Sequence, residues 1–318
     1  MKKFLLTLII LSLSVSGLFA GGQRSAPVND GRLNVVTSIF PAFDFVRQIA
    51  GDRVNLTMLI PPGAESHSFE PTPRDMITIM NSDVFIYVGD SEQWVERILR
   101  SMNTNEMRVF ALTNHVELLL NEEEHDHDCD DDPDCIDDHL ICSLFDEHVW
   151  TSPRNAILIV RAITELLSAA DPANAYLFRQ NAALFINELE QLDAAFVELT
   201  SGAARHTVVF GDRFPLRYFA EAYGLTWHAA FDGCSTLTDP SPARIASLIN
   251  IVRNEQIPVV FHIELSNERI ADVIIEATGA RKLQFHSAHN VTRQEFNDGL
   301  TYIAIMRRNL DNLRIALH

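Results

Sequence analysis

The sequence is short of positive charge, and no stretch of it gathers basic residues. Its 318 residues include 25 lysines and arginines against 43 aspartates and glutamates, which gives a net charge of −18. Proteins that bind nucleic acids carry a basic patch or stripe that meets the phosphate backbone. The composition therefore argues against a nucleic-acid partner, whereas an acidic chain is compatible with a cation as its ligand.

The sequence also lacks the short motifs of common hydrolases and nucleotide-binding enzymes. It contains no HExxH zinc-protease motif, no GxSxG nucleophile elbow and no Walker phosphate loop. We therefore expect no enzymatic activity. A secreted zinc hydrolase stays as an alternative, which would need a metal with an open position for water and a general base beside it.

Long apolar runs are missing except at the N-terminus. Lys2 and Lys3 precede an apolar run at residues 4–15, and the small residue Ala20 follows shortly after. This pattern predicts a cleavable signal peptide over residues 1–20, too short in its apolar part to span a bilayer comfortably. No cysteine stands near the predicted cut, so we expect no lipid anchor and a protein located in the periplasm.

Cysteines are few and none of them forms a CxxC pair, the spacing of tight zinc sites. Cys129, Cys135 and Cys142 are close in sequence and Cys234 is remote. Export places them in an oxidising compartment, where disulfides form. We favour the pairs Cys129–Cys135 and Cys142–Cys234 among the three possible pairings. Thiolate ligands to a metal are the alternative.

Apolar strand-like runs alternate with helical stretches in both halves of the chain. Such a rhythm predicts an α/β fold of βα units with mainly parallel sheets. The predicted strands cover residues 33–40, 54–60, 83–88, 108–112, 207–210, 258–263 and 282–285. A final helix is predicted over residues 293–317.

The chain is longer than one compact core usually holds, so we expect two domains. The N-terminal lobe is predicted over residues 30–170, a long linking helix over 173–200 and the C-terminal lobe over 205–318. The N-terminal lobe includes an insert at 121–139 that is rich in Asp, Glu and His. Such an insert is either a solvated loop or a weak collector of cations.

Three histidines stand at the ends of predicted elements where ligands of α/β proteins bind. His67 lies beyond the strand that ends at Ile60, His148 precedes a helix, and His286 directly follows a strand. Ligands of open α/β sheets bind outside the carboxyl ends of the strands. Neutral imidazoles that meet at one point suit tetrahedral zinc. Any one of the three alone is as easily explained as a surface-loop histidine.

Longer motifs surround two of these histidines. One extends from the run at residues 35–41 through Pro61-Pro62-Gly63 to His67 and on to residues 69–75; the other, at residues 146–156, contains His148. They resemble the zinc- and manganese-binding solute-binding proteins of ABC transporters (cluster A-I), and the resemblance covers essentially the whole chain after the signal peptide. It implies two βα lobes joined by one long backbone helix, a metal in the cleft between them, and His67 and His148 as ligands of the N-terminal lobe.

The C-terminal lobe departs from that family's pattern. The family usually has a ligating His or Glu after the strand that ends at Phe210, where this chain has Gly211-Asp212-Arg213. The family's late aspartate ligand is replaced at its place by His286. The remaining ligand is Asp212 by position or Glu264, which follows another strand. The alternative role of Asp212 is an ion pair with Arg213 or Arg217, and that of Glu264 is to bond to backbone amides at the edge of the cleft. His262 and His289 are expected either to support the ligands from outside the coordination sphere or to have structural roles.

The resemblance implies high-affinity capture of a divalent metal and its delivery to the membrane permease of an ABC importer, by a protein expected to be monomeric. Three imidazoles and one carboxylate favour Zn²⁺ over Mn²⁺, which prefers more oxygen ligands. The alternatives are a manganese-specific binding protein and a metal-dependent adhesin with the same fold.

Overall fold

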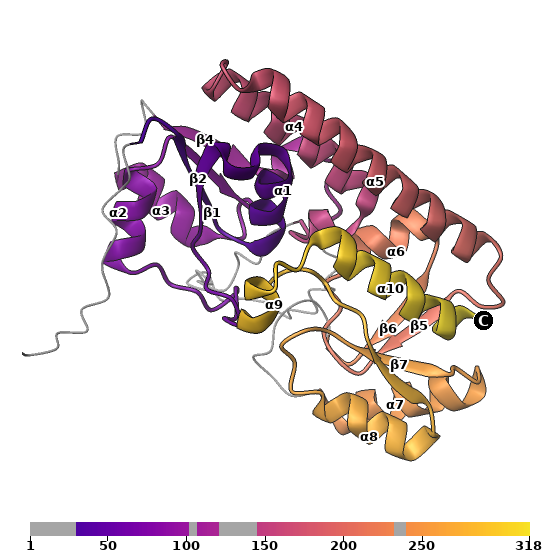
Figure 1. The fold of residues 1–318 in the computed structure, drawn as a ribbon. Helices are drawn as coiled ribbons and strands as arrows, with labels where there is room; N and C mark the ends of the chain where they lie inside the picture. Colours follow the sequence, from indigo (N-terminus) through magenta and orange to yellow (C-terminus); the bar gives the residue numbers. More distant parts are fainter. Residues whose placement is uncertain (1–29, 102–106, 121–144, 232–239) are drawn as a thin grey trace, which may run out of the picture.

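The protein folds into two lobes, each built on a four-stranded parallel sheet (Figure 1). The computed structural model describes residues 30–101, 107–120, 145–231 and 240–318. The strand orders are β2-β1-β3-β4 and β6-β5-β7-β8, so the two sheets have the same topology. The predicted α/β class with two lobes and parallel sheets is confirmed.

Each sheet presents the carboxyl ends of its strands at one edge. The strands of the N-terminal lobe are β1 (Leu33–Thr37), β2 (Val54–Met58), β3 (Val84–Tyr87) and β4 (Arg108–Ala111); those of the C-terminal lobe are β5 (Thr207–Phe210), β6 (Thr226–Ala229), β7 (Val259–His262) and β8 (Arg281–Gln284). The central strands β3 and β7 are almost entirely buried, as expected for parallel strands covered by helices on both faces.

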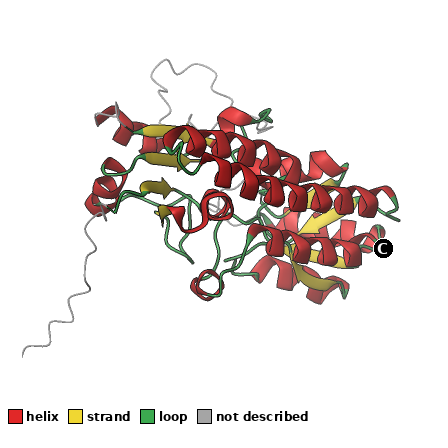
Figure 2. Ribbon diagram, turned by 45° about the horizontal axis from the view of Figure 1, so that its top comes forward, coloured by secondary structure: helices red, strands yellow, loops and turns green. Residues whose placement is uncertain are grey.

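Helices cover these sheets and connect the lobes. In the N-terminal lobe they are α1 (Phe40–Ala50), α2 (Pro73–Met80) and α3 (Gln93–Ser101); the connection is made by α4 (Pro153–Ala170) and α5 (Ala175–Ser201); the C-terminal lobe has α6 (Arg217–Tyr223), α7 (Pro242–Asn254), α8 (Arg269–Thr278), α9 (Arg293–Asn297) and α10 (Tyr302–Leu317). The long helix α5 packs against α4 and α1 and also against α10 and α6 of the C-terminal lobe. Figure 2 shows these long helices running side by side across the molecule.

The lobes share one apolar core and several hydrogen bonds. Buried side chains from α1, α5, β5 and α10 belong to a single cluster. The indole Nε1 of Trp150 donates to the Ser287 carbonyl over 2.9 Å, and the Tyr302 hydroxyl donates to the Trp150 carbonyl over 2.7 Å. The backbone N–H of Tyr302 donates to Asp44 in α1 over 2.6 Å. The lobes are therefore joined along their interface and not only through a linker.

Two expectations about the C-terminal lobe need correction. The helix predicted over residues 293–317 is two helices, α9 and α10, because Gly299 adopts a φ of +75° and the Thr301 side chain caps a new helix by accepting from Ala304 N–H. A glycine takes such a left-handed conformation without steric cost, so the chain turns there. Strand β6 was not predicted, because it is short and partly exposed at the edge of its sheet.

Several predicted features lie outside the described residues: the signal peptide, the acidic insert at 121–139, and Cys129, Cys135, Cys142 and Cys234. Within the described residues, none of the helices combines the length and the apolar character that crossing a membrane requires.

Candidate metal centre

His67 lies on the His67 loop (residues 59–72), which leaves the carboxyl end of β2 and leads to α2. Its side chain is 32% exposed, and its Nδ1 lies 3.1 Å from Oε1 of Glu147. Thr72 ends the loop by capping α2: its hydroxyl accepts from the backbone N–H of Asp75, whose carboxylate accepts from Thr72 in return. The loop thus holds an imidazole at the edge of the sheet where the sequence predicts a ligand.

His148 is buried directly before a single 3₁₀ turn (Val149–Thr151) that leads into α4. Its Nδ1 lies 2.8 Å from Oδ1 of Asp146, the same oxygen that accepts its backbone N–H. Burial raises the pKa of Asp146, but the neighbouring His148 outweighs this and leaves the pKa below its usual value. An ionised carboxylate only accepts hydrogen bonds, so Nδ1 is the nitrogen that donates, and in the neutral ring the lone pair is on Nε2.

His289 belongs to the His289 segment (residues 285–292), which connects β8 to α9 in the C-terminal lobe. Burial, together with the nearby His67 and His148, holds the pKa of His289 well below its usual value. Its imidazole is therefore neutral at neutral pH, which is the form that binds a metal.

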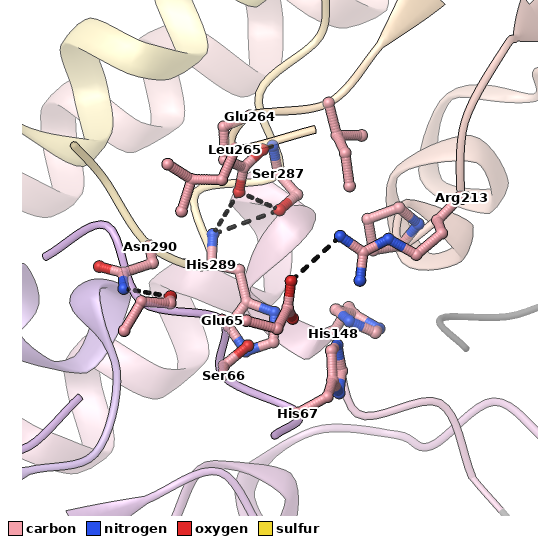
Figure 3. A pocket seen from close by; sticks show the side chains of 13 residues that line it. Glu65, Ser66, His67, His148, Arg213, Glu264, Leu265, Ser287, His289 and Asn290 are labelled. Atoms are coloured by element: carbon pink, nitrogen blue, oxygen red, sulfur yellow. Dashed lines mark hydrogen bonds and ion pairs between the residues drawn. The ribbon is translucent and has the colours of Figure 1, made fainter. Parts of the chain in front are cut away.

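These three histidines meet in the cleft between the lobes. One nitrogen from each of His67, His148 and His289 lies within 4.8 Å of the other two. Nitrogens bound to one tetrahedral zinc at 2.0–2.1 Å are about 3.4 Å apart, so small side-chain movements suffice to bring all three onto one ion. Figure 3 shows the His67 and His148 imidazoles side by side, with His289 facing them.

The histidines line a pocket of about 360 Å³, open solvent included, to which both lobes contribute. Arg213 brings a positive charge into it and pairs with Glu65 of the His67 loop over 3.3 Å (Figure 3). Burial raises the pKa of Glu65, and Arg213 with its hydrogen bond lowers it further than that, so the carboxylate stays ionised. The pocket is thus a polar site with charges of both signs.

The group of histidines that the structure brings together differs from the predicted combination of His67, His148 and His286, because it contains His289 in place of His286. The His286 Nδ1 accepts from Ala288 N–H over 2.9 Å, and its backbone N–H and carbonyl both bond to the Asn309 side chain at 2.8 Å. Ala288 has a φ of +61°, which is uncommon for a residue with a Cβ. This turn buries His286 inside the lobe and leaves His289 at the cleft.

The two carboxylates predicted as ligands also have other partners. Glu264 lines the pocket, but its oxygens accept from the Ser287 N–H and hydroxyl and from the His289 N–H. Asp212 accepts the backbone N–H groups of Arg213 and Ile263. Neither belongs to the group of possible ligands among the described residues. Both carboxylates hold loops in place. Bonding to backbone amides is the alternative that the sequence left open for Glu264, whereas the alternative for Asp212 was an ion pair.

Sequence reasoning missed three residues of this site: His289 as a member of the cluster, Glu147 beside His67, and Arg213 in the pocket. The available signal was the Asp146-Glu147-His148 triplet, since carboxylates next to a histidine commonly orient it. No sequence pattern predicts that the backbone of Ala288 adopts a left-handed conformation.

Comparison with known proteins gives a consistent result. The family described as zinc-uptake complex component A, periplasmic (ZnuA), matches residues 35–316. The zinc-binding lipoprotein AdcA of Streptococcus pneumoniae is 32% identical over 99% of this chain. The chain spans 61% of that relative's length. The high-affinity zinc uptake system protein ZnuA of Bacillus subtilis is 29% identical over 93% of this chain and 91% of its own.

Solved structures show the same fold. The Zn(II)-bound ZnuA-like domain of Streptococcus pneumoniae AdcA superposes with a TM-score of 0.74 at 30% identity, over 90% of this chain and 99% of that one. The laminin-binding protein Lmb of Streptococcus agalactiae, described as having adhesin and metal-transporting activity, gives 0.74 at 25% identity, over 90% of this chain and all of the other. The extent of the family match shows that this chain belongs to the ZnuA family of periplasmic zinc-uptake components.

Proposed function

We propose that this protein captures a zinc ion on His67, His148 and His289 outside the cytoplasm and delivers it to the membrane permease of an ABC importer. The observation that carries the proposal is the convergence of three imidazoles from two lobes within 4.8 Å of one another. Relatives whose names state zinc binding and zinc uptake support it. We further propose that the protein acts in the periplasm, which the description of its family supports, and as a monomer, because a single chain supplies all three histidines.

Zinc is favoured over manganese by the chemistry of the donors. The group of possible ligands among the described residues consists of histidines alone. Imidazole suits Zn²⁺, whereas Mn²⁺ prefers carboxylate and carbonyl oxygens. Since Glu264 and Asp212 are already bonded to backbone amides, we propose that water occupies the fourth position of the ion.

A binding role is also favoured over a hydrolytic one. A zinc hydrolase needs a carboxylate or similar base free to take a proton from the metal-bound water. The carboxylates around the cleft have other partners: Glu264 bonds to Ser287, Glu147 contacts His67, and Glu65 pairs with Arg213. The ion is therefore cargo on which no chemistry is performed.

Calorimetric titration of zinc into His148→Ala tests the proposal. This variant removes a buried imidazole and leaves Asp146 with only the backbone N–H of residue 148 as a partner at that oxygen. We expect affinity to fall by more than the ~10- to 100-fold that is typical of changes outside the ligand sphere. His115→Ala, which removes an exposed histidine stacked on Phe110, is the control and should bind like the unchanged protein. Unchanged zinc affinity in His148→Ala would sink the proposal.

A further inference from the structure

Two consecutive carboxylates serve two different histidines of the cluster. Asp146 lies 2.8 Å from Nδ1 of His148. Glu147 turns the other way and places Oε1 3.1 Å from Nδ1 of His67, a residue eighty positions earlier in the chain. The same Oε1 lies 3.8 Å from Nε2 of His148, which is beyond hydrogen-bond distance.

The two contacts have the same consequence for the two rings. A carboxylate accepts a hydrogen bond and cannot donate one, so each facing Nδ1 must carry the proton. In a neutral ring the lone pair is then on Nε2, the nitrogen left for a metal. Carboxylates in this position fix the orientation of a metal-binding imidazole and make it a stronger donor to the ion.

His67 has particular need of such a partner. It stands on a loop outside any helix or strand, and its side chain is 32% exposed, whereas that of His148 is 2% exposed and packed against Trp150. A partly exposed imidazole on a loop has several rotamers available, and ordering it costs free energy when the ion binds. The Glu147 side chain is only 13% exposed, so its carboxylate is a well-placed anchor.

Charge balance supports the same assignment. A divalent ion and the guanidinium of Arg213 bring three positive charges to one partly buried pocket. Asp146, Glu147 and Glu65 bring three negative charges to its histidines and to Arg213. Glu264 adds a further carboxylate to the lining. Buried charge is tolerated only when it is compensated, and Glu147 supplies compensating charge directly beside His67.

We propose that Glu147 is a positioning residue of the metal centre, which holds His67 in the Nδ1–H form with Nε2 directed at the ion. This inference rests on the proposed function, but the contact between Glu147 and His67 on which it is built exists in the metal-free protein as well. It predicts that Glu147 contributes to metal affinity without being a ligand.

The test combines zinc titration with imidazole ¹⁵N spectra of Glu147→Ala and Glu147→Gln. We expect Glu147→Ala to lower zinc affinity by ~10- to 100-fold, the range for such partners. Glu147→Gln keeps an acceptor oxygen but loses the charge, so its affinity should lie between those of the alanine variant and the unchanged protein. Glu70→Gln, which removes a 78% exposed carboxylate from the His67 loop, is the matched control and should bind zinc normally.

The spectra read the proton position on His67 directly. In the unchanged protein without metal, His67 should carry its proton on Nδ1, and this preference should disappear in Glu147→Ala. Either an Nε2–H form of His67 in the unchanged protein or full zinc affinity in both Glu147 variants would overturn the inference. A protein that binds no zinc at all would instead overturn the proposed function, and the His67 spectrum would still decide whether Glu147 holds the ring.

Discussion

The two lobes hold their histidines by different means. In the N-terminal lobe each imidazole faces a carboxylate through Nδ1, at 2.8 Å for His148 and 3.1 Å for His67. In the C-terminal lobe the carboxylate of Glu264 accepts the backbone N–H of His289 and does not contact its ring. The first arrangement fixes a side chain, whereas the second fixes the main chain and depends on the conformation of the whole segment. The C-terminal half of the site is therefore the harder half to read from sequence.

Replacing each of the two C-terminal histidines in turn gives the largest expected effect on zinc affinity. His289→Ala removes a member of the cluster, so zinc affinity should fall by more than the ~10- to 100-fold typical of outer contacts. His286→Ala removes a buried ring that contacts Ala288 and should mainly lower the free energy of unfolding. Zinc titration and urea unfolding of both variants separate the two effects.

The opposite outcome would restore the assignment made from sequence. If His286→Ala loses zinc binding while a folded His289→Ala keeps it, the comparison between the lobes fails. Cobalt absorption spectra of the variants provide a second measurement, since loss of an imidazole from the ion changes the ligand field and loss of a buried structural ring does not.

Glu264→Gln tests how the main chain of the His289 segment is held, and we expect its effect to be intermediate in size. An amide cannot accept on both of its terminal atoms, so at least one of the donors from Ser287 and His289 loses its partner. A buried donor without a partner costs about 1–3 kcal/mol, and we expect the free energy of unfolding to fall by about that much. Urea unfolding of the metal-free protein measures it, with Glu276→Gln on the exposed face of α8 as the control. If Glu264 were a ligand, zinc affinity would instead change more than stability.

Replacing Glu92, in the N-terminal lobe, should have the smallest effect on zinc affinity but should change how the free energy of unfolding depends on pH. Burial raises the pKa of Glu92 from 4.5 to about 8, against the hydrogen bonds that it accepts from Val88 N–H and the Ser38 hydroxyl. The folded protein therefore binds this proton more tightly than the unfolded chain does. The free energy of unfolding should fall as the pH rises from 4.5 to about 8, where the folded state has to bear a buried charge.

Glu92→Gln should remove that part of the slope. Thermal or urea unfolding at several pH values compares it with Glu198→Gln, which alters an exposed position on α5. Parallel pH profiles for the unchanged protein and the Glu92 variant would show that the carboxyl is not buried in the neutral form.

Much of the fold could be predicted from the sequence because its signals are local. Pro73 after Thr72 begins α2, and the apolar run that contains β3 is bounded by polar residues. His67 and His148 could be found because each follows or precedes such an element within a long motif. The choice between His286 and His289 could not, because it depends on one alanine in a left-handed conformation that the surrounding structure imposes.

The side-chain amide of Asn290 links the His289 segment to the His67 loop. It donates to the carbonyls of Pro61 and Ala64, each over 2.9 Å, while Gly63 N–H donates to the carbonyl of Val291 over 2.7 Å. The segment that carries His289 is thereby fastened to the loop that carries His67. Much of the conformational entropy of assembling the site is therefore lost during folding, before any ion arrives. Metal entry and exit should then be accompanied by small rearrangements and not by a wide swing of the lobes, which scattering profiles with and without zinc would reveal as nearly superimposable curves.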